Sequence, residues 1–344
     1  MNVQNESYKI SLVSHQPKEA ENTLYLSKYA PKSLDEIVGN ENLVRLFKYY
    51  LRVKDFPNMI LLGPTGTGKT TMIQLFIKQF LGPHYHTHHL EIYGSLHRGR
   101  CIISQASENS KNCEKGIPNI LNFLKKSLKA RDVKKIITIF DFEYTIGETQ
   151  MSLRRIMEEH DNVRFILACN SRDNISETIQ SRTNIYSLQR VPNSGLKSLI
   201  NKIVDKEKLK LAPDIIDCLA QHSDGNIRVA INTLQLVSET SELDLKRFYQ
   251  IVNLPASFKV EELFAACLAG GEDNAIKILD DLINNGYSLV DLLNLMLKTV
   301  INSEKFNTET KNRIIETVSS FFLVNETSLT LTNMYCLIYR LLCP

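Results

Sequence analysis

The stretch that decides the fold is residues 58–70, which read NMILLGPTGTGKT. Residues 58–62 form a short apolar run, typical of a buried β-strand. The rest matches GxxxxGK followed by Thr, the spacing of a loop that binds nucleotide phosphates. Residues 70–80 continue with helical periodicity and end at Gly82-Pro83, a usual exit from a helix. A strand, a glycine-rich loop and a helix in this order predict an α/β fold with a P-loop.

The residue types of this loop suit phosphate and magnesium. Its glycines let backbone N–H groups curl round the phosphates, and the helix N-terminus adds positive potential. Lys69 is expected to reach the β- and γ-phosphates, and Thr70 to ligate Mg²⁺. The residues of this segment predicted to bind nucleotide are Gly63, Pro64, Thr65, Gly66, Thr67, Gly68, Lys69, Thr70 and Thr71.

Composition excludes several classes of protein. The chain has 344 residues, 43% of them hydrophobic, and a net charge of +3, so any surface for nucleic acid must be a local patch. No apolar run approaches the roughly 18 residues of a membrane helix, and the first 20 residues do not resemble a secretory signal. The seven cysteines are scattered without a CxxC pair, which favours reduced thiols over a disulfide framework or a zinc ribbon.

Further along the chain, strands alternate with helices and then disappear. Residues 89–93, 135–140 and 163–169 read as strands, with a helix near 150–160, and predict a parallel sheet covered on both faces. After Pro192 only helical patterns remain. We predict a polar tail over 1–22, a nucleotide-binding domain over 23–190, a helical lid over 191–252 and a helical collar over 253–344.

The end of the strand at 135–140 carries the acidic residues. Asp141 is expected to hold Mg²⁺ opposite the P-loop. A hydrolytic enzyme usually has a glutamate directly after this aspartate, but Phe142 stands there and Glu143 follows. Strand alternation predicts that Glu143 points to the same side as Asp141, and a solvated loop carboxylate is an equal alternative. Nucleotide binding is therefore predicted, whereas hydrolysis by this chain is left open.

Short motifs spread over residues 24–344 resemble those of one family. They are KYAP at 28–31, LDEIVG at 34–39, LEIYGSLHRG at 90–99, LRRIME at 153–158, ACN at 168–170, IQSR at 179–182, GNIR at 225–228 and NGYS at 285–288. With the P-loop, they resemble the small subunits of replication factor C, the AAA+ sliding-clamp loaders of eukaryotes and archaea. The departures are Phe142, Ala30 in place of a customary Arg, Leu96-His97 in place of acidic residues, and Thr183 in place of a Cys.

The resemblance implies roles for individual residues. Val38 lies in the segment that wraps the adenine. Asn170 resembles sensor 1, which orients the attacking water or the γ-phosphate, and Arg228 resembles sensor 2, a cationic contact to the nucleotide of the same chain. Arg182 resembles an arginine finger that acts in trans on a neighbouring subunit's ATP. Asp141, Glu143, Asn170 and Arg182 are thus the candidate catalytic residues, and Thr70 and Asp141 the magnesium ligands.

The resemblance also implies a function and partners. It predicts an AAA+ domain, a lid and a collar that oligomerises, with ATP and Mg²⁺ as cofactors and sister subunits in a hetero-pentamer. Such a complex loads a PCNA-like clamp on primer–template DNA, in the nucleus or at a viral replication site. Two alternatives stay open: an ATP-binding scaffold that does not hydrolyse, and another AAA+ DNA-processing ATPase such as a branch-migration motor.

Two weaker features have less specific readings. Residues 125–135 carry a net charge of +5, which fits either a solvated helix face or a phosphate contact inside a ring. Five histidines between residues 84 and 97 form a patch for which a solvated loop is favoured over a metal site.

Overall fold

The computed structural model describes residues 24–96, 119–125, 134–240, 244–252, 257–284, 287–302, 306–324 and 330–342. The chain divides into two compact units. One comprises the chain up to Glu207 together with Ala220–Gln235, and the other Lys208–Leu219 together with the chain from Leu236 onward. The limits of a separate lid at 191–252 stay a prediction.

The first unit is built on a parallel sheet of five strands in the order β2-β3-β4-β1-β5. The strands are β1 Met59–Leu62, β2 His89–Tyr93, β3 Lys135–Phe140, β4 Val163–Cys169 and β5 Asn184–Ser187. The predicted parallel sheet is confirmed. Edge strand β5 was absent from the prediction, because its two apolar residues, Ile185 and Tyr186, are too few for a pattern to emerge.

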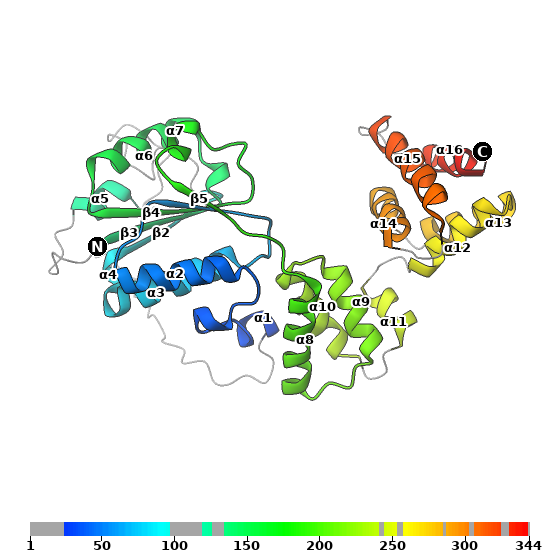
Figure 1. The fold of residues 1–344 in the computed structure, drawn as a ribbon, viewed down its shortest axis with the longest axis horizontal. Coiled ribbons are helices and arrows are strands. Elements are labelled where there is room, and N and C mark those ends of the chain that lie inside the picture. The colour runs from blue at the N-terminus through cyan, green and yellow to red at the C-terminus, as the bar shows by residue number, and fades with distance from the viewer. Residues whose placement is uncertain are drawn as a thin grey trace, which may run out of the picture. The chain divides into compact units, whose positions relative to one another are not determined.

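Helices cover both faces of this sheet, as Figure 1 shows. On one face lie α2 Glu41–Val53 and α3 Lys69–Leu81, and on the other α5 Ile120–Lys125, α6 Gly147–Glu159 and α7 Glu177–Gln180. The remaining helices of this unit are α1 Tyr25–Lys28, α4 Tyr85–His88, α8 Asn193–Glu207 and most of α10 Ile227–Ser238. The predicted AAA+-type architecture of a covered parallel sheet is therefore present.

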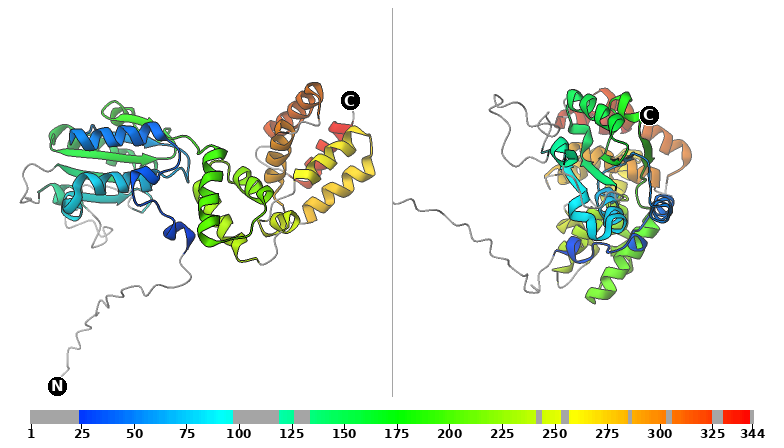
Figure 2. Two further views of the ribbon diagram at one scale, coloured as in Figure 1. Left: turned by 60° about the horizontal axis from the view of Figure 1, so that its bottom comes forward. Right: turned by 90° about the vertical axis from the view of Figure 1, so that its left-hand side faces the viewer.

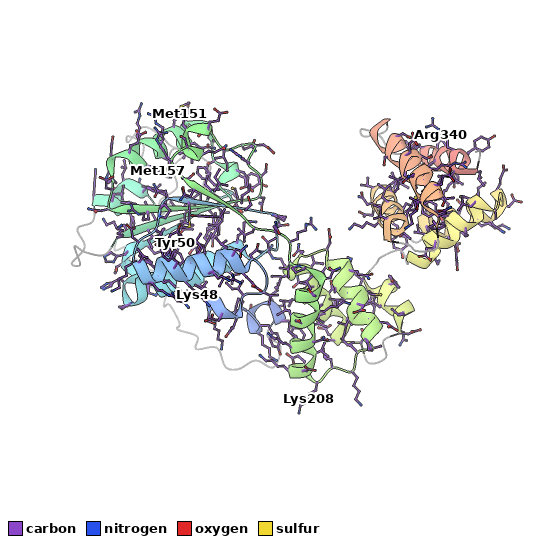
Figure 3. All side chains as sticks on the ribbon, viewed as in Figure 1. Lys48, Tyr50, Met151, Met157, Lys208 and Arg340 are labelled. Atoms are coloured by element: carbon purple, nitrogen blue, oxygen red, sulfur yellow. The ribbon has the colours of Figure 1, made fainter. Side chains whose placement is uncertain are left out.

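Apolar spacing decides which side of each helix is buried. On α6, Leu153, Ile156 and Met157 recur every three or four residues and pack against the sheet. Met151 lies on the outer side of the same helix and is 67% exposed (Figure 3). Residues 34–51, whose apolar residues recur at helical spacing, do not form one helix, because the chain turns at Gly39 and Asn40, whose φ angles are +80° and +52°. Only Leu34–Glu36 and α2 are helical there.

Within its described residues, the second unit has helices and no strands. It contains most of α9 Pro213–Ser223, together with α11 Leu245–Ile251, α12 Ser257–Leu268, α13 Glu272–Asn284, α14 Leu289–Asn302, α15 Thr308–Val324 and α16 Leu331–Leu342. Figure 2 shows α12 to α16 gathered into one bundle. Their apolar faces share a core that includes Phe264, Leu292 and Leu337. Within the described residues, no helix is long and apolar enough to cross a membrane.

The sheet topology brings three loops to one edge. β1 leads into the P-loop, β3 leads to Asp141, and β4 leads to Asn170. Because β4 pairs in parallel with both β1 and β3, the carboxyl ends of these strands are neighbours. Ligands of open α/β sheets bind outside such carboxyl ends.

Candidate nucleotide-binding site

The P-loop needs its glycines for backbone conformation and for space. Gly66 and Gly68 have φ angles of +75° and +89°, where residues with a Cβ are strained. A Cβ on Gly66 would also lie 1.8 Å from Oδ1 of Asn226. Thr67 is buried and donates its hydroxyl proton to the Pro64 carbonyl at 2.9 Å. These contacts hold the loop in a curled form directly before α3.

Lys69 is the first residue of α3, and its side chain reaches back to the start of the loop. Its ammonium donates to the carbonyl oxygens of Gly63 and Pro64, at 2.6 and 2.9 Å, and to Oδ1 of Asn170 at 2.9 Å. These three bonds match the three donors of an ammonium group. Burial lowers the pKa of Lys69, and the nearby carboxylates of Glu143 and Asp141 oppose that shift. The predicted phosphate-binding lysine and sensor-like Asn170 therefore meet at one point.

Glu143 joins the same cluster, and it reaches the cluster through a turn rather than through a continuing strand. Asp141 has a φ of +53° and ends the strand, and the chain continues as a 3-10 turn over Phe142–Tyr144. This turn buries the Phe142 ring completely and leaves Glu143 only 8% exposed. Oε1 of Glu143 accepts hydrogen bonds from Nδ2 and the backbone N–H of Asn170, at 2.6 and 3.2 Å. A solvated loop carboxylate is thus excluded.

The other oxygen of Glu143 is buried without a partner. Within the described part of the chain, Oε2 of Glu143 makes no hydrogen bond. A buried carboxylate oxygen is costly to leave unpaired, so this atom favours a donor such as a water molecule. Asn170 links Glu143 to Lys69, since its amide nitrogen donates to the carboxylate and its amide oxygen accepts from the ammonium.

Asp141 and Thr70 are the predicted magnesium ligands. Oδ2 of Asp141 accepts a 3.0 Å hydrogen bond from the Ser95 hydroxyl, a contact that the sequence prediction missed. Thr70 lies in the first turn of α3 with an exposed side chain, and Thr65 is exposed at the loop tip. One hydroxyl and one carboxylate are oxygen donors of the type that Mg²⁺ prefers, and the curled loop suits phosphates. The residues present therefore fit a magnesium–nucleotide complex.

A pocket of about 170 Å³ adjoins the P-loop. Its lining is mostly apolar and includes the residues Leu26, Tyr29, Ala30, Pro31, Val38, Gly66, Thr67, Gly68, Thr71, Leu199, Ile227, Arg228 and Ile231. Val38, Thr71 and Arg228, all predicted from the sequence, are thus brought together beside the glycine loop. An apolar lining of this kind suits a nucleobase.

Polar contacts on two sides fix the walls of this pocket. The Tyr29 hydroxyl donates to Glu207 on α8 at 2.6 Å, and Lys28 forms a 2.6 Å ion pair with the same carboxylate. On the other side, the backbone N–H of Ile227 donates to the Gly66 carbonyl at 3.0 Å. Asn226 caps α10 by accepting from the backbone N–H groups of Arg228 and Val229. The start of α10 therefore rests directly on the P-loop and brings Arg228 to the pocket.

Families of known proteins match successive parts of the chain. The ATPase family associated with various cellular activities (AAA) matches residues 59–190. The RCF1/5-like AAA+ ATPase lid domain matches residues 198–238, and the Replication factor C C-terminal domain matches residues 255–322. The Replication factor C small subunit of Thermoplasma volcanium is 30% identical over 277 residues, which cover 78% of this chain and 81% of that one. The chain belongs to the replication factor C small-subunit family.

Other relatives agree with this family. The Replication factor C small subunit of Sulfolobus acidocaldarius is 29% identical, covering 83% of this chain and 84% of the relative. Replication factor C subunit 4 of Encephalitozoon cuniculi is 27% identical, covering 82% and 87%. Among solved structures, the Thermotoga maritima RuvB Holliday junction branch migration motor aligns with a TM-score of 0.51 at 17% identity, over 69% of this chain and 78% of that one. At that identity the likeness shows a shared fold alone.

In this replication factor C chain, Arg182 lies apart from the Lys69 cluster. Its Nε donates to Oε1 of Glu158 at 2.6 Å, and its Nη1 donates to the Thr178 carbonyl at 2.9 Å. Arg154 lies 3.8 Å from the same carboxylate. Glu158, which the sequence prediction did not single out as a partner, therefore holds the guanidinium at the surface.

Where they are described, two lysines of the basic stretch bind other residues of the chain, and the expected solvated loop of histidines is wrong, since residues 82–88 are helical, His89 begins β2 and His88 is buried. Lys134 pairs with Asp55, and Lys135 donates to the carbonyls of Phe123 and Leu124 at 3.0 and 2.8 Å. Lys126, Lys129, Arg131 and His97 lie outside the described residues. Within the described ranges, no three His, Cys, Asp or Glu side chains gather as metal ligands.

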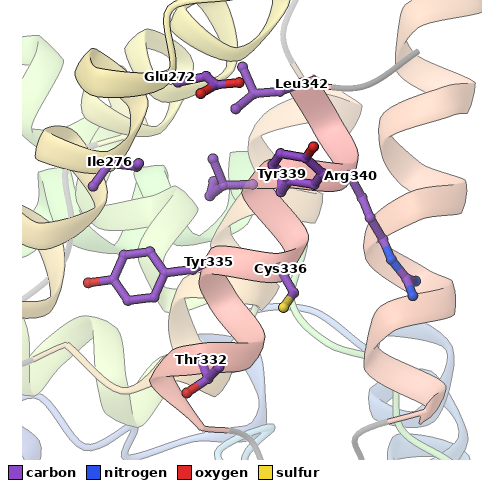
Figure 4. A pocket seen from close by; sticks show the side chains of 9 residues that line it. Glu272, Ile276, Thr332, Tyr335, Cys336, Tyr339, Arg340 and Leu342 are labelled. Carbon is purple, nitrogen blue, oxygen red and sulfur yellow. The ribbon is translucent and has the colours of Figure 1, made fainter.

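A second cavity, of about 490 Å³, lies in the C-terminal unit between α13 and α16. Figure 4 shows Tyr335 on one side of α16 and Arg340 extending from another. This cavity lacks a glycine loop, and its wall includes the carboxylate of Glu272. Its chemistry does not match that of a phosphate site, so the P-loop pocket is the candidate nucleotide site.

Proposed function

We propose that this chain is an ATP-dependent clamp-loader subunit that acts in DNA replication and loads a PCNA-like clamp on primer–template DNA. Membership of the replication factor C small-subunit family supports the role, and the P-loop cluster supports ATP as the ligand. In a eukaryotic cell, this role requires residence in the nucleus.

One observation carries the chemical part of the proposal. Glu143, Asn170 and Lys69 form a continuous hydrogen-bonded chain, and the free oxygen of Glu143 is buried beside it. With nucleotide bound, a water molecule that reaches Oε2 of Glu143 would give its proton to that oxygen, while the water oxygen bonds to the γ-phosphorus and ADP leaves with the broken P–O bond. Lys69 exchanges main-chain carbonyls for phosphate oxygens and stabilises their developing charge. Glu143 therefore acts as the general base, the role of the glutamate that usually stands at the position of Phe142.

The remaining residues bind and orient the nucleotide. Thr70 and Asp141 hold Mg²⁺, which neutralises phosphate charge when bound. The apolar wall that includes Val38 receives the adenine, and Arg228 approaches the phosphates from the start of α10. A guanidinium matches phosphate geometry, so this contact ties the nucleotide to α10.

Arg182 acts on a different nucleotide. It is surface-exposed and its partners Glu158 and Thr178 lie outside the Lys69 cluster of its own chain, which suits a finger reaching the ATP of a neighbouring subunit. The functional unit is accordingly a ring of sister subunits, a hetero-pentamer, that encloses DNA and reads its backbone and shape.

Clamp loading by the assembled complex tests this function. The chain is combined with its sister subunits, and loading of a fluorescent PCNA-like clamp on primed DNA is followed with ATP. We expect Lys69→Ala to reduce ATP binding and slow loading, because the phosphate contact is lost. The matched control is Lys197→Ala, at a lysine of α8 outside the P-loop pocket. A chain that joins no such complex, or loads no clamp in its wild-type form, would contradict the proposal.

A further inference from the structure

We propose that Ser95 is a positioning residue that orients the Asp141 carboxylate for Mg²⁺. The inference rests on the proposed ATP site and adds a residue to it. Asp141 is the carboxylate of the predicted magnesium pair, and its Oδ2 accepts a 3.0 Å hydrogen bond from Oγ of Ser95. Among the described residues, no other hydrogen bond to this carboxylate is found.

Register brings the two residues together. β2 and β3 pair in parallel with Tyr93 opposite Phe140, so the residues that follow these two strands are neighbours. The backbone N–H of Gly94 extends the pairing by donating to the Phe140 carbonyl at 2.8 Å. Ser95 therefore lies just after β2 and Asp141 just after β3, at the same edge of the sheet.

Gly94 permits the close approach that the hydrogen bond requires. A Cβ at this position would lie 2.5 Å from the main-chain oxygen of Asp141 and 3.1 Å from Cγ2 of Thr145. Real Cβ atoms do not come so close to a backbone oxygen, so any larger residue would push the two strand ends apart. Gly94 therefore allows the two strand ends to approach, and Ser95 donates the hydrogen bond across them.

Asp141 has a particular need for such a donor. Its φ of +53° takes the residue out of the strand, so the sheet ladder no longer fixes its side chain. The Ser95 hydroxyl binds Oδ2 and leaves Oδ1 available to the cation or its water. Partners that orient a metal-binding carboxylate commonly change metal affinity by about 10- to 100-fold when they are removed.

Binding of a fluorescent ATP analogue to the purified full-length chain, titrated with Mg²⁺ and separately with EDTA, tests this inference. We expect Ser95→Ala to weaken binding about 10-fold in Mg²⁺, to raise the Mg²⁺ midpoint, and to leave the affinity in EDTA unchanged. Ser95→Thr keeps a hydroxyl and should stay close to wild type. Ser198→Ala, at an exposed serine of α8, is the matched control.

Three results would overturn the inference. The first is an equal loss of affinity in Ser95→Ala with and without Mg²⁺, which would mark a purely structural role. The second is no loss of affinity in Ser95→Ala, and the third is a loss in Ser95→Thr as large as in Ser95→Ala. If the wild-type chain binds no nucleotide under either condition, the proposed ATP site itself is wrong. Thermal unfolding of each variant shows whether the fold is retained.

Discussion

The side-chain amide of Asn170 bridges Glu143 and Lys69. Its Nδ2 lies 2.6 Å from Oε1 of Glu143, and its Oδ1 lies 2.9 Å from Nζ of Lys69. A carboxylate and an ammonium are thus joined through one neutral group that donates to the first and accepts from the second. This arrangement aims both charged groups at the edge of the sheet where the P-loop lies.

Removal of this bridge should slow the chemical step more than it weakens binding. In Asn170→Ala, the Glu143 carboxylate loses its shortest hydrogen bond and is no longer held in place. We expect kcat for ATP hydrolysis by the complex to fall by about 10²-fold while KM changes little. Asn174→Ala, at an exposed asparagine of the following loop, is the control. A rise in KM with kcat unchanged would assign Asn170 to ground-state binding instead.

A glutamate at position 142 should lower the stability of the protein without supplying a working base. The Phe142 ring is completely buried among apolar residues such as Ile139 and Leu167. Phe142→Glu places an unpaired carboxylate in this core and should cost about 4 kcal/mol or more of unfolding free energy. Urea unfolding measures the loss, with Tyr144→Glu as the control, since Tyr144 is 50% exposed. A stable Phe142→Glu chain with faster hydrolysis would refute the role given to Glu143.

Cys169 should resist alkylation in the native chain. Burial, reinforced by the nearby Glu143 charge, raises the pKa of this thiol to about 12. The raised pKa keeps the group protonated at pH 8, and only the thiolate reacts readily. Peptide mapping after iodoacetamide treatment should find Cys169 unmodified and the exposed Cys336 modified. Equal modification of both residues in the folded chain would contradict the described packing.

The Arg182–Glu158 pair should matter only in the assembled ring. Arg182→Ala removes a guanidinium that makes no contact with the Lys69 cluster of its own chain, so ATP binding by the isolated chain should be unchanged. Turnover by the complex should fall by about 10³-fold at the site that Arg182 serves. Arg172→Ala, at a neighbouring exposed arginine, is the control. If Arg182→Ala weakened ATP binding by the isolated chain and left turnover by the complex unchanged, action in trans would be contradicted.

The sequence predicted the parts of the site that depend on local signals. The P-loop, its preceding strand and its following helix are contiguous, so glycine spacing and apolar periodicity located them. The surroundings of Glu143 could not be predicted in this way. Strand alternation assumes that the strand continues, whereas Asp141 adopts a positive φ that ends it. Such a turn is stabilised by contacts far along the chain, with Ser95 and Asn170, which no local pattern reveals.

Residue spacing along the chain is also insufficient to define two other elements, the start of α2 and the strand β5. Gly39 and Asn40 interrupt the helical pattern before α2, although the apolar spacing continues across them. The edge strand β5 has too few apolar residues for recognition, and its place is defined by pairing with β1. In both cases the deciding interactions are tertiary.

The most direct test of the account compares ATP binding and single-turnover hydrolysis for Glu143→Gln in the assembled complex with clamp and primed DNA. Glu159→Gln, at an exposed glutamate of α6, is the matched control. We predict that Glu143→Gln binds ATP as tightly as wild type but loses this subunit's share of turnover, because the amide cannot take a proton from water. Turnover at this site that survives in Glu143→Gln would show that Glu143 is not the base. A wild-type site that binds ATP without ever hydrolysing it would show that the chain is a scaffold.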